Sequence, residues 1–97
     1  MNETIQGAQE LYENRGDGFE LLDSEDAYFG DNWFYLTLQG PRGGRAAEVF
    51  EEELMGIARK LWGELGDKLE LSTGQEGRSG CYQWVLEGRL KSLGERG

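Results

Sequence analysis

The stretch WFYLTLQGPRGGRAAEVFEEELMGIARKLWGEL, residues 33–65, decides the fold, because its hydrophobic period changes along it from two residues to about 3.6. Residues 33–38 alternate between an apolar set, Phe34, Leu36 and Leu38, and a mixed set, which predicts a strand with one face in the core. In residues 45–65 the apolar side chains recur at helical spacing: Phe50, Leu54, Ile57, Ala58, Leu61 and Leu65. We therefore expect a strand followed by one long amphipathic helix.

The residues before this stretch predict a helix and a second strand. Asn2 or Thr4 is a suitable cap for a helix that ends at Gly16. Its apolar side would consist of Ile5, Ala8, Leu11 and Tyr12. The apolar run at residues 19–22 lies between a glycine and the acidic segment 23–26, which favours a short strand.

The residues after this stretch predict a hairpin. Residues 68–73 alternate polar and apolar side chains, and residues 81–86 place Tyr82, Trp84 and Leu86 on one face. The order α-β-β-α-β-β predicts one α+β domain over residues 1–97, a two-layer sandwich of one long helix on a mainly antiparallel or mixed sheet of about four strands. We expect the helix to bury Phe50, Leu54, Ile57 and Leu61 against Phe34, Leu36, Leu38, Tyr82 and Trp84.

The composition limits the classes of function. Asp and Glu number 19 and Lys and Arg number 10, and the net charge of -9 opposes direct binding to nucleic acid or to anionic lipid. The longest uncharged stretch, residues 32–41, is far shorter than the roughly 20 apolar residues of a membrane span. The single cysteine, Cys81, cannot form a disulfide within the chain, and the first residues lack a secretory signal. We expect a cytoplasmic protein.

Catalytic, cofactor and metal sites have little support in the sequence. The chain has no histidine, which excludes an imidazole base or ligand and leaves Cys81 without a partner base, so we interpret Cys81 as a packed strand residue. The acidic residues 23–31 do not fit a calcium-binding loop. We expect no enzyme activity, no cofactor and no metal.

The acidic residues are unevenly distributed. Residues 1–40 contain nine acids and one base, a net charge of -8, whereas residues 41–97 have a net charge of -1. Aromatic residues lie in or beside the acidic run, and together they give a candidate partner-binding set: Asp17, Glu20, Asp23, Glu25, Asp26, Tyr28, Asp31, Trp33 and Tyr35. Charge would steer a basic partner and the aromatic rings would supply affinity. The alternative interpretation is an aromatic core beside a solvated acidic loop.

The loop between the central strand and the long helix, residues 40–45, gives a second candidate site. Arg42, Gly43, Gly44 and Arg45 provide guanidinium groups and free backbone N–H groups that suit an anion. The alternative interpretation is a tight turn that needs glycine geometry.

These patterns favour a small acidic noncatalytic domain that masks the basic surface of a protein partner, as an inhibitor, an immunity protein or a phosphate or nucleic-acid mimic does. Two alternatives stay open. One is a binder or enzyme of small anionic ligands that uses residues 40–45. The other is a homodimer or larger homo-oligomer that pairs through the sheet face carrying Trp33 and Tyr35.

Overall fold

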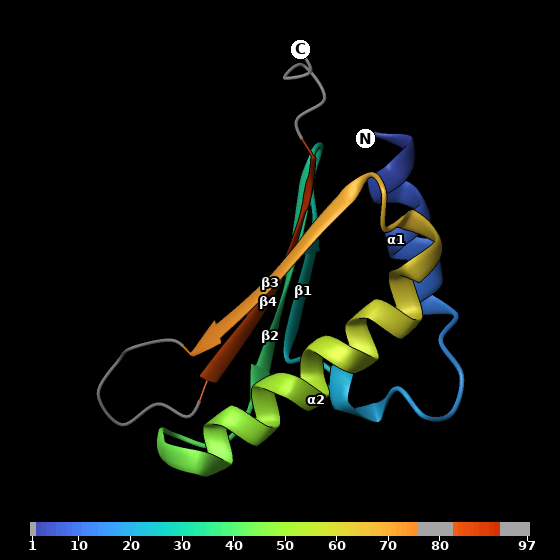
Figure 1. Ribbon diagram of the computed structural model, residues 1–97. Coiled ribbons are helices and arrows are strands. Elements are labelled where there is room, and N and C mark those ends of the chain that lie inside the picture. Colours follow the sequence, from blue (N-terminus) through green and yellow to red (C-terminus); the bar gives the residue numbers. More distant parts are fainter. Residues whose placement is uncertain (1, 76–82, 92–97) are drawn as a thin grey trace.

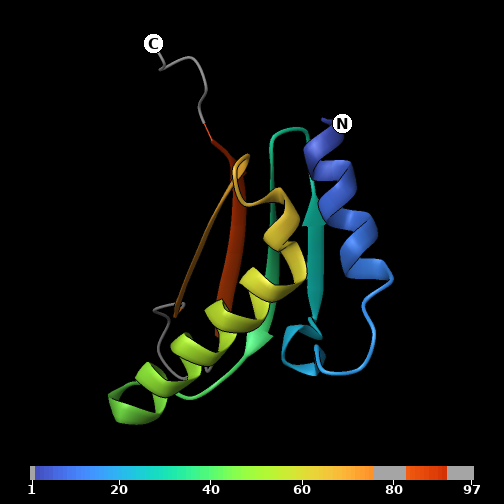
Figure 2. The ribbon, with the colours of Figure 1, turned by 45° about the vertical axis from the view of Figure 1, so that its right-hand side comes forward.

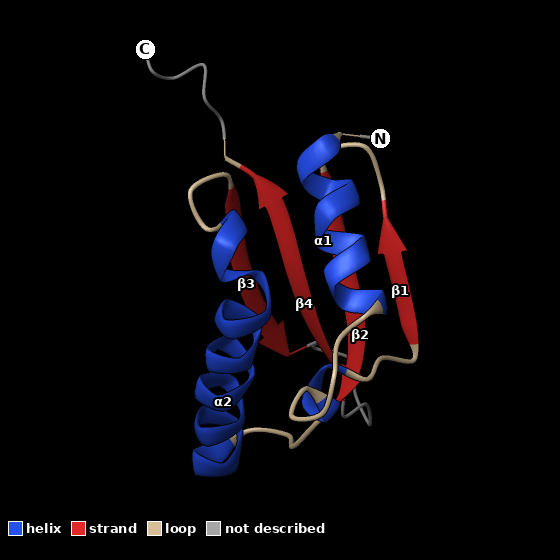
Figure 3. Cartoon of the chain, turned by 90° about the vertical axis from the view of Figure 1, so that its right-hand side faces the viewer, coloured by secondary structure: helices blue, strands red, loops and turns tan. Residues whose placement is uncertain are grey.

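The computed structural model describes residues 2–75 and 83–91, which form a four-stranded sheet with both α-helices on one face (Figures 1 and 3). The elements in chain order are α1 (Glu3–Glu13), the 3-10 helix η1 (Glu20–Leu22), β1 (Asp26–Phe29), β2 (Trp33–Gln39), α2 (Gly44–Trp62), the 3-10 helix η2 (Gly63–Leu65), β3 (Leu69–Gln75) and β4 (Gln83–Leu90). The prediction of an α+β sandwich is confirmed.

The sheet is antiparallel throughout, with strand order β1-β2-β4-β3. The central pair is β2 and β4, in which Leu36 lies opposite Leu86. The turn between β1 and β2 is held at both sides: the carbonyl of Asp31 accepts the N–H of Asn2 (3.3 Å), and the carbonyl of Asn32 accepts the N–H of Leu90 (3.1 Å). This end of the sheet is therefore fixed to the start of α1.

The core lies between the helices and the inner face of the sheet. Figure 2 shows the helices on one side of the strands. The sheet contributes Phe34, Leu36, Leu38, Leu69, Trp84 and Leu86, and the helical layer contributes Ile5, Ala8, Tyr12, Leu22, Ala47, Leu54, Ala58, Leu61 and Trp62. Of the helix residues expected to be buried, Leu54 and Leu61 are, whereas Phe50 and Ile57 are only half-buried at the border of the core. The predicted contact with Tyr82 lies outside the described residues.

The two helices are joined by a buried hydrogen bond. The Trp62 indole N–H of α2 donates to the Ala8 carbonyl of α1 over 3.0 Å. The Trp62 ring also packs against Phe34, with 4.9 Å between the ring centroids. A single large side chain thereby connects both helices to the sheet.

The prediction of a strand at residues 19–22 is wrong, because this segment forms η1 and the strand follows at Asp26–Phe29. The tight 3-10 turn places Leu22 in the core with no exposed surface. The Leu22 carbonyl accepts a hydrogen bond from the Tyr12 hydroxyl (3.0 Å), which fixes the turn against α1. The apolar residues of this run therefore serve helix packing rather than a sheet.

The strand predicted to end at residue 86 continues through Gly88 to Leu90. A Cβ atom at Gly88 would overlap the Phe34 ring, so glycine is needed there by close packing. The start of the predicted strand, Cys81 and Tyr82, lies outside the described residues.

Candidate functional site

The outer face of the sheet, opposite both helices, carries a cluster of three aromatic side chains. Tyr28 of β1 lies directly across from Tyr35 of β2, and Trp33 precedes Tyr35 by two residues on the same face. The ring centroids are separated by 5.8 Å for Tyr28 and Trp33, 5.7 Å for Tyr28 and Tyr35, and 5.4 Å for Trp33 and Tyr35. We call these three residues the aromatic cluster.

The aromatic cluster is partly open to solvent. Tyr28 is 48% exposed, and Trp33 and Tyr35 are half-buried. Neither helix covers this face, because α1 and α2 both pack on the opposite side of the sheet (Figure 3). An uncovered apolar patch with a charged border is a usual mark of an interaction site.

Charged side chains from two strands border the aromatic cluster. Asp26 precedes Tyr28 by two residues on β1, and Glu87 of β4 lies directly across from Tyr35. The Arg89 guanidinium lies 5.4 Å from the centroid of the Trp33 ring, and its Nε lies 3.6 Å from Glu87 Oε1. The side chains of Arg89 and Glu87 are 60% and 31% exposed, so solvent weakens this ion pair and leaves Glu87 able to change partner.

The structure divides the predicted partner-binding residues between two regions. Asp26, Tyr28, Trp33 and Tyr35 share the outer face of the sheet, and Asp31 lies in the turn at the end of that hairpin. Glu25 precedes β1, and its Oε2 accepts a hydrogen bond from the Gln39 amide (2.6 Å).

The remaining acids of this set, Asp17, Glu20 and Asp23, lie in the connection between α1 and β1. Asp23 forms an ion pair with Arg15 at the end of α1, and Glu20 borders a hollow beside α2. These three residues therefore belong to the helical side of the molecule, apart from the aromatic cluster.

Glu87 and Arg89 belong to this face but were not among the predicted site residues. The polar alternation of residues 83–89 was the available signal, since it shows that these side chains share one face. Only the pairing of β4 with β2 places that face beside the aromatic cluster.

The loop at residues 40–45 has the geometry of a tight turn. Gly43 and Gly44 have φ values of 69° and 68°, a backbone conformation that favours glycine. The Gly43 N–H donates to Gln75 Oε1 (3.3 Å), and the Trp84 indole N–H donates to the Pro41 carbonyl (2.8 Å). The glycines are thus explained by the turn, and anion binding by Arg42 and Arg45 stays a prediction.

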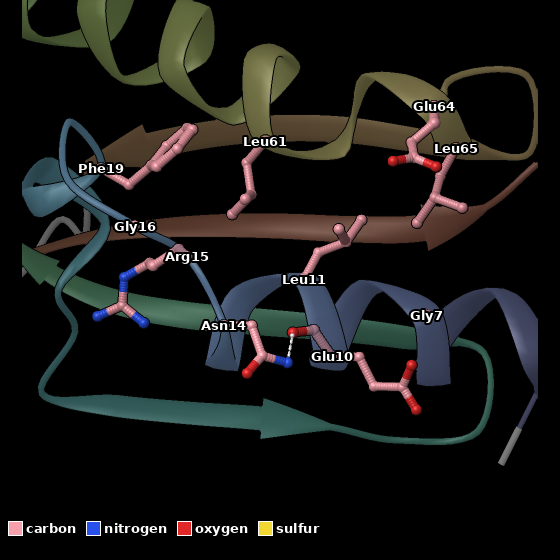
Figure 4. A pocket seen from close by; sticks show the side chains of 10 residues that line it. All are labelled: Gly7, Glu10, Leu11, Asn14, Arg15, Gly16, Phe19, Leu61, Glu64 and Leu65. Carbon is pink, nitrogen blue, oxygen red and sulfur yellow. Dashed lines mark hydrogen bonds between the residues drawn. The ribbon is translucent and has the colours of Figure 1, made fainter.

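Two hollows of the helical layer lie between α2 and a neighbouring element. The first, about 520 Å³, lies between α1 and α2, where Leu11 points toward Leu61 and Leu65 and where Phe19 closes one end (Figure 4). The second, about 570 Å³, lies between α2 and the η1 region and is lined by Leu21 and Ile57.

Comparison of the chain with protein-family models, with curated proteins and with solved structures finds no match. Within residues 2–75 and 83–91, no three or more Cys, Asp or Glu side chains are grouped in a way that would hold a metal ion. None of the helices in this part of the chain has the length and apolar character to cross a bilayer.

Proposed function

We propose that this protein is a noncatalytic binding domain that masks a basic surface on a protein partner through the outer face of its sheet. The observation that carries the proposal is the aromatic cluster, which neither helix covers and which the carboxylates of Asp26 and Glu87 border together with Arg89. Inhibitors, immunity proteins and mimics of phosphate or nucleic acid are classes of protein that can mask a basic surface in this way.

The chemistry of the face suits a partner rich in arginine or lysine. Tyr and Trp side chains provide large contact areas and are common among the residues that dominate binding energy. A cation can lie over their rings, as Arg89 lies over Trp33 within the chain itself. The net charge of -9 would attract such a partner from a distance and raise the association rate.

Self-association through the same face is less favourable on electrostatic grounds. Two copies would each bring a net charge of -9, and Asp26 and Glu87 outnumber the single cation Arg89 at the border of each cluster. Repulsion between like charges opposes this pairing. A solution mass of two chains that falls to one chain in Tyr28→Ala would favour the homodimer instead.

The test begins with affinity capture from cells of the source organism. The wild-type chain and a double variant, Tyr28→Ala with Trp33→Ala, serve as parallel baits, and proteins that bind only the wild type are purified. We expect a basic protein, with an affinity for the double variant lower by about tenfold or more because buried aromatic residues dominate such contacts.

Association kinetics then separate the effect of the charges beside the aromatic cluster from the effect of the net charge of the chain. Reversing Asp26 and Glu87 to lysine should lower the association rate and flatten its dependence on salt. Reversing Glu48 and Glu52 to lysine changes the net charge equally but on the exposed side of α2, and should have a smaller effect. Equal responses to both charge variants, or equal affinity for the aromatic double variant, would contradict the proposal.

A further inference from the structure

The two hollows between α2 and its neighbouring elements follow one side of α2 and of η2. The second hollow is lined by Glu53, Gly56, Ile57 and Lys60, and the first by Leu61, Glu64 and Leu65. Steps of three or four residues connect the positions from Glu53 to Leu61, so they form one stripe on α2, and Glu64 and Leu65 continue it in η2. From Glu53 to Leu61 the part of this stripe on α2 is about 12 Å long. We call the stripe and its two hollows the α2 groove.

Each hollow contains a helical glycine that neither backbone geometry nor packing requires. Gly7 in α1 lines the first hollow and Gly56 in α2 lines the second. A Cβ atom at either position would meet no atom within 4 Å, and neither residue has a positive φ. Glycine in a helix interior is less favourable than alanine. The absence of a side chain at these two positions keeps both hollows open.

The border of the α2 groove is mainly acidic. Glu10 and Glu64 border the first hollow, and Glu20 and Glu53 border the second. Two cations lie at the same border, but Arg15 is already paired with Asp23. The other cation, Lys60, lines the second hollow, and its Nζ lies 5.9 Å from the centroid of the Phe19 ring, which lines the first. The floor is apolar, with Leu11, Leu21, Ile57 and Leu61.

We propose that the α2 groove binds a helical segment of a protein partner that carries apolar side chains on one face and lysine or arginine beside them. Two hollows along one stripe suit apolar anchors one or two turns apart on such a helix. The four carboxylates of the border complement its basic residues. The groove lies on the layer opposite the aromatic cluster, so this second docking site does not depend on the proposed function.

A displayed library of random peptides of about 16 residues, long enough to form a helix of about 24 Å, provides the probe. The baits are the wild-type chain and a filled variant, Gly7→Leu with Gly56→Leu, whose added side chains occupy the hollows. Peptides enriched only on the wild type should combine Leu, Ile or Phe at helical spacing with Lys or Arg. Their affinity for the filled variant should be lower by about tenfold or more.

Two matched controls separate the groove from other effects. Ala46→Leu adds the same side chain at an exposed position of α2 outside both hollows, and should bind the selected peptide as the wild type does. Tyr28→Ala should also leave the affinity unchanged, because Tyr28 lies on the outer face of the sheet. If the filled variant does not fold, as judged by circular dichroism, Glu10→Lys with Glu64→Lys replaces it and should also weaken binding.

Several results would overturn the proposal. One is a selection in which no peptide prefers the wild type to the filled variant. Another is a set of groove-dependent peptides that lack basic residues. A third is self-association of the chain that the filled variant abolishes, since a second copy would then be the occupant. Because Tyr28→Ala and the filled variant are measured separately, failure of this proposal and failure of the proposed function can be told apart.

Discussion

The inner and outer faces of the sheet are built from alternate residues of the same strands, yet they differ in burial. On β2, Phe34, Leu36 and Leu38 have at most 1% of their surface exposed, whereas Trp33 and Tyr35 are half-buried. Both sets contain aromatic rings, so residue type alone does not distinguish them. What distinguishes them is the cover provided by α1 and α2, which turns one face into core and leaves the other available for contact.

The largest expected effect contrasts two neighbouring aromatic residues of β2. Phe34→Ala removes a ring that packs against Trp62 and Phe29, and should lower the free energy of unfolding by about 3–5 kcal/mol. Tyr35→Ala, one residue later on the outer face, should cost about 1 kcal/mol or less. Urea denaturation measures both. Similar losses for the two variants would break the comparison between the faces.

A second prediction concerns the cover of the inner face. Leu54 of α2 has no exposed surface, and Leu54→Ala should lower the free energy of unfolding by about 2–5 kcal/mol. Glu52→Ala, on the exposed side of the same helix, is the control and should change it by less than about 0.5 kcal/mol. Thermal unfolding followed by circular dichroism suits both variants. A loss below that control value for Leu54→Ala would refute this packing.

The smallest of the three effects uses two glycines of the sheet. Gly88→Ala forces a Cβ atom into the Phe34 ring on the inner face and should cost about 1–3 kcal/mol. Gly74→Ala, at an exposed position of β3 with no atom within 4 Å of the added carbon, should be nearly neutral. If chemical denaturation gives equal stabilities for the two variants, the close packing at Gly88 is not what selects glycine there.

Much of the fold could be predicted because two strong periodicities meet at the loop of residues 40–45. The alternation in β2 and the helical spacing in α2 each repeat several times, so single exceptions such as Gly56 do not hide them. The first strand was misplaced because Asp26–Phe29 is short, lies at the sheet edge and is mostly exposed. It is held by backbone pairing with β2, and side-chain patterns report such pairing weakly.

The candidate sites could also be predicted only in part from the sequence. Alternation alone put Trp33 and Tyr35 on the face opposite Phe34, where the structure has them. It could not show that Glu87 lies beside them, because that depends on which strand neighbours β2. Nor could it show the α2 groove, since Gly7 and Gly56 line hollows only when α1 and η1 lie beside α2.

The strand order has a consequence for synthesis on the ribosome. The strand that comes last among the described elements, β4, lies between β2 and β3 and pairs with both. Until residues 83–90 have left the exit tunnel, neither β3 nor the free edge of β2 has β4 as its partner strand. Pairing between residues distant in sequence also slows folding through its high contact order. The four-stranded sheet therefore closes only when β4 is inserted between β2 and β3.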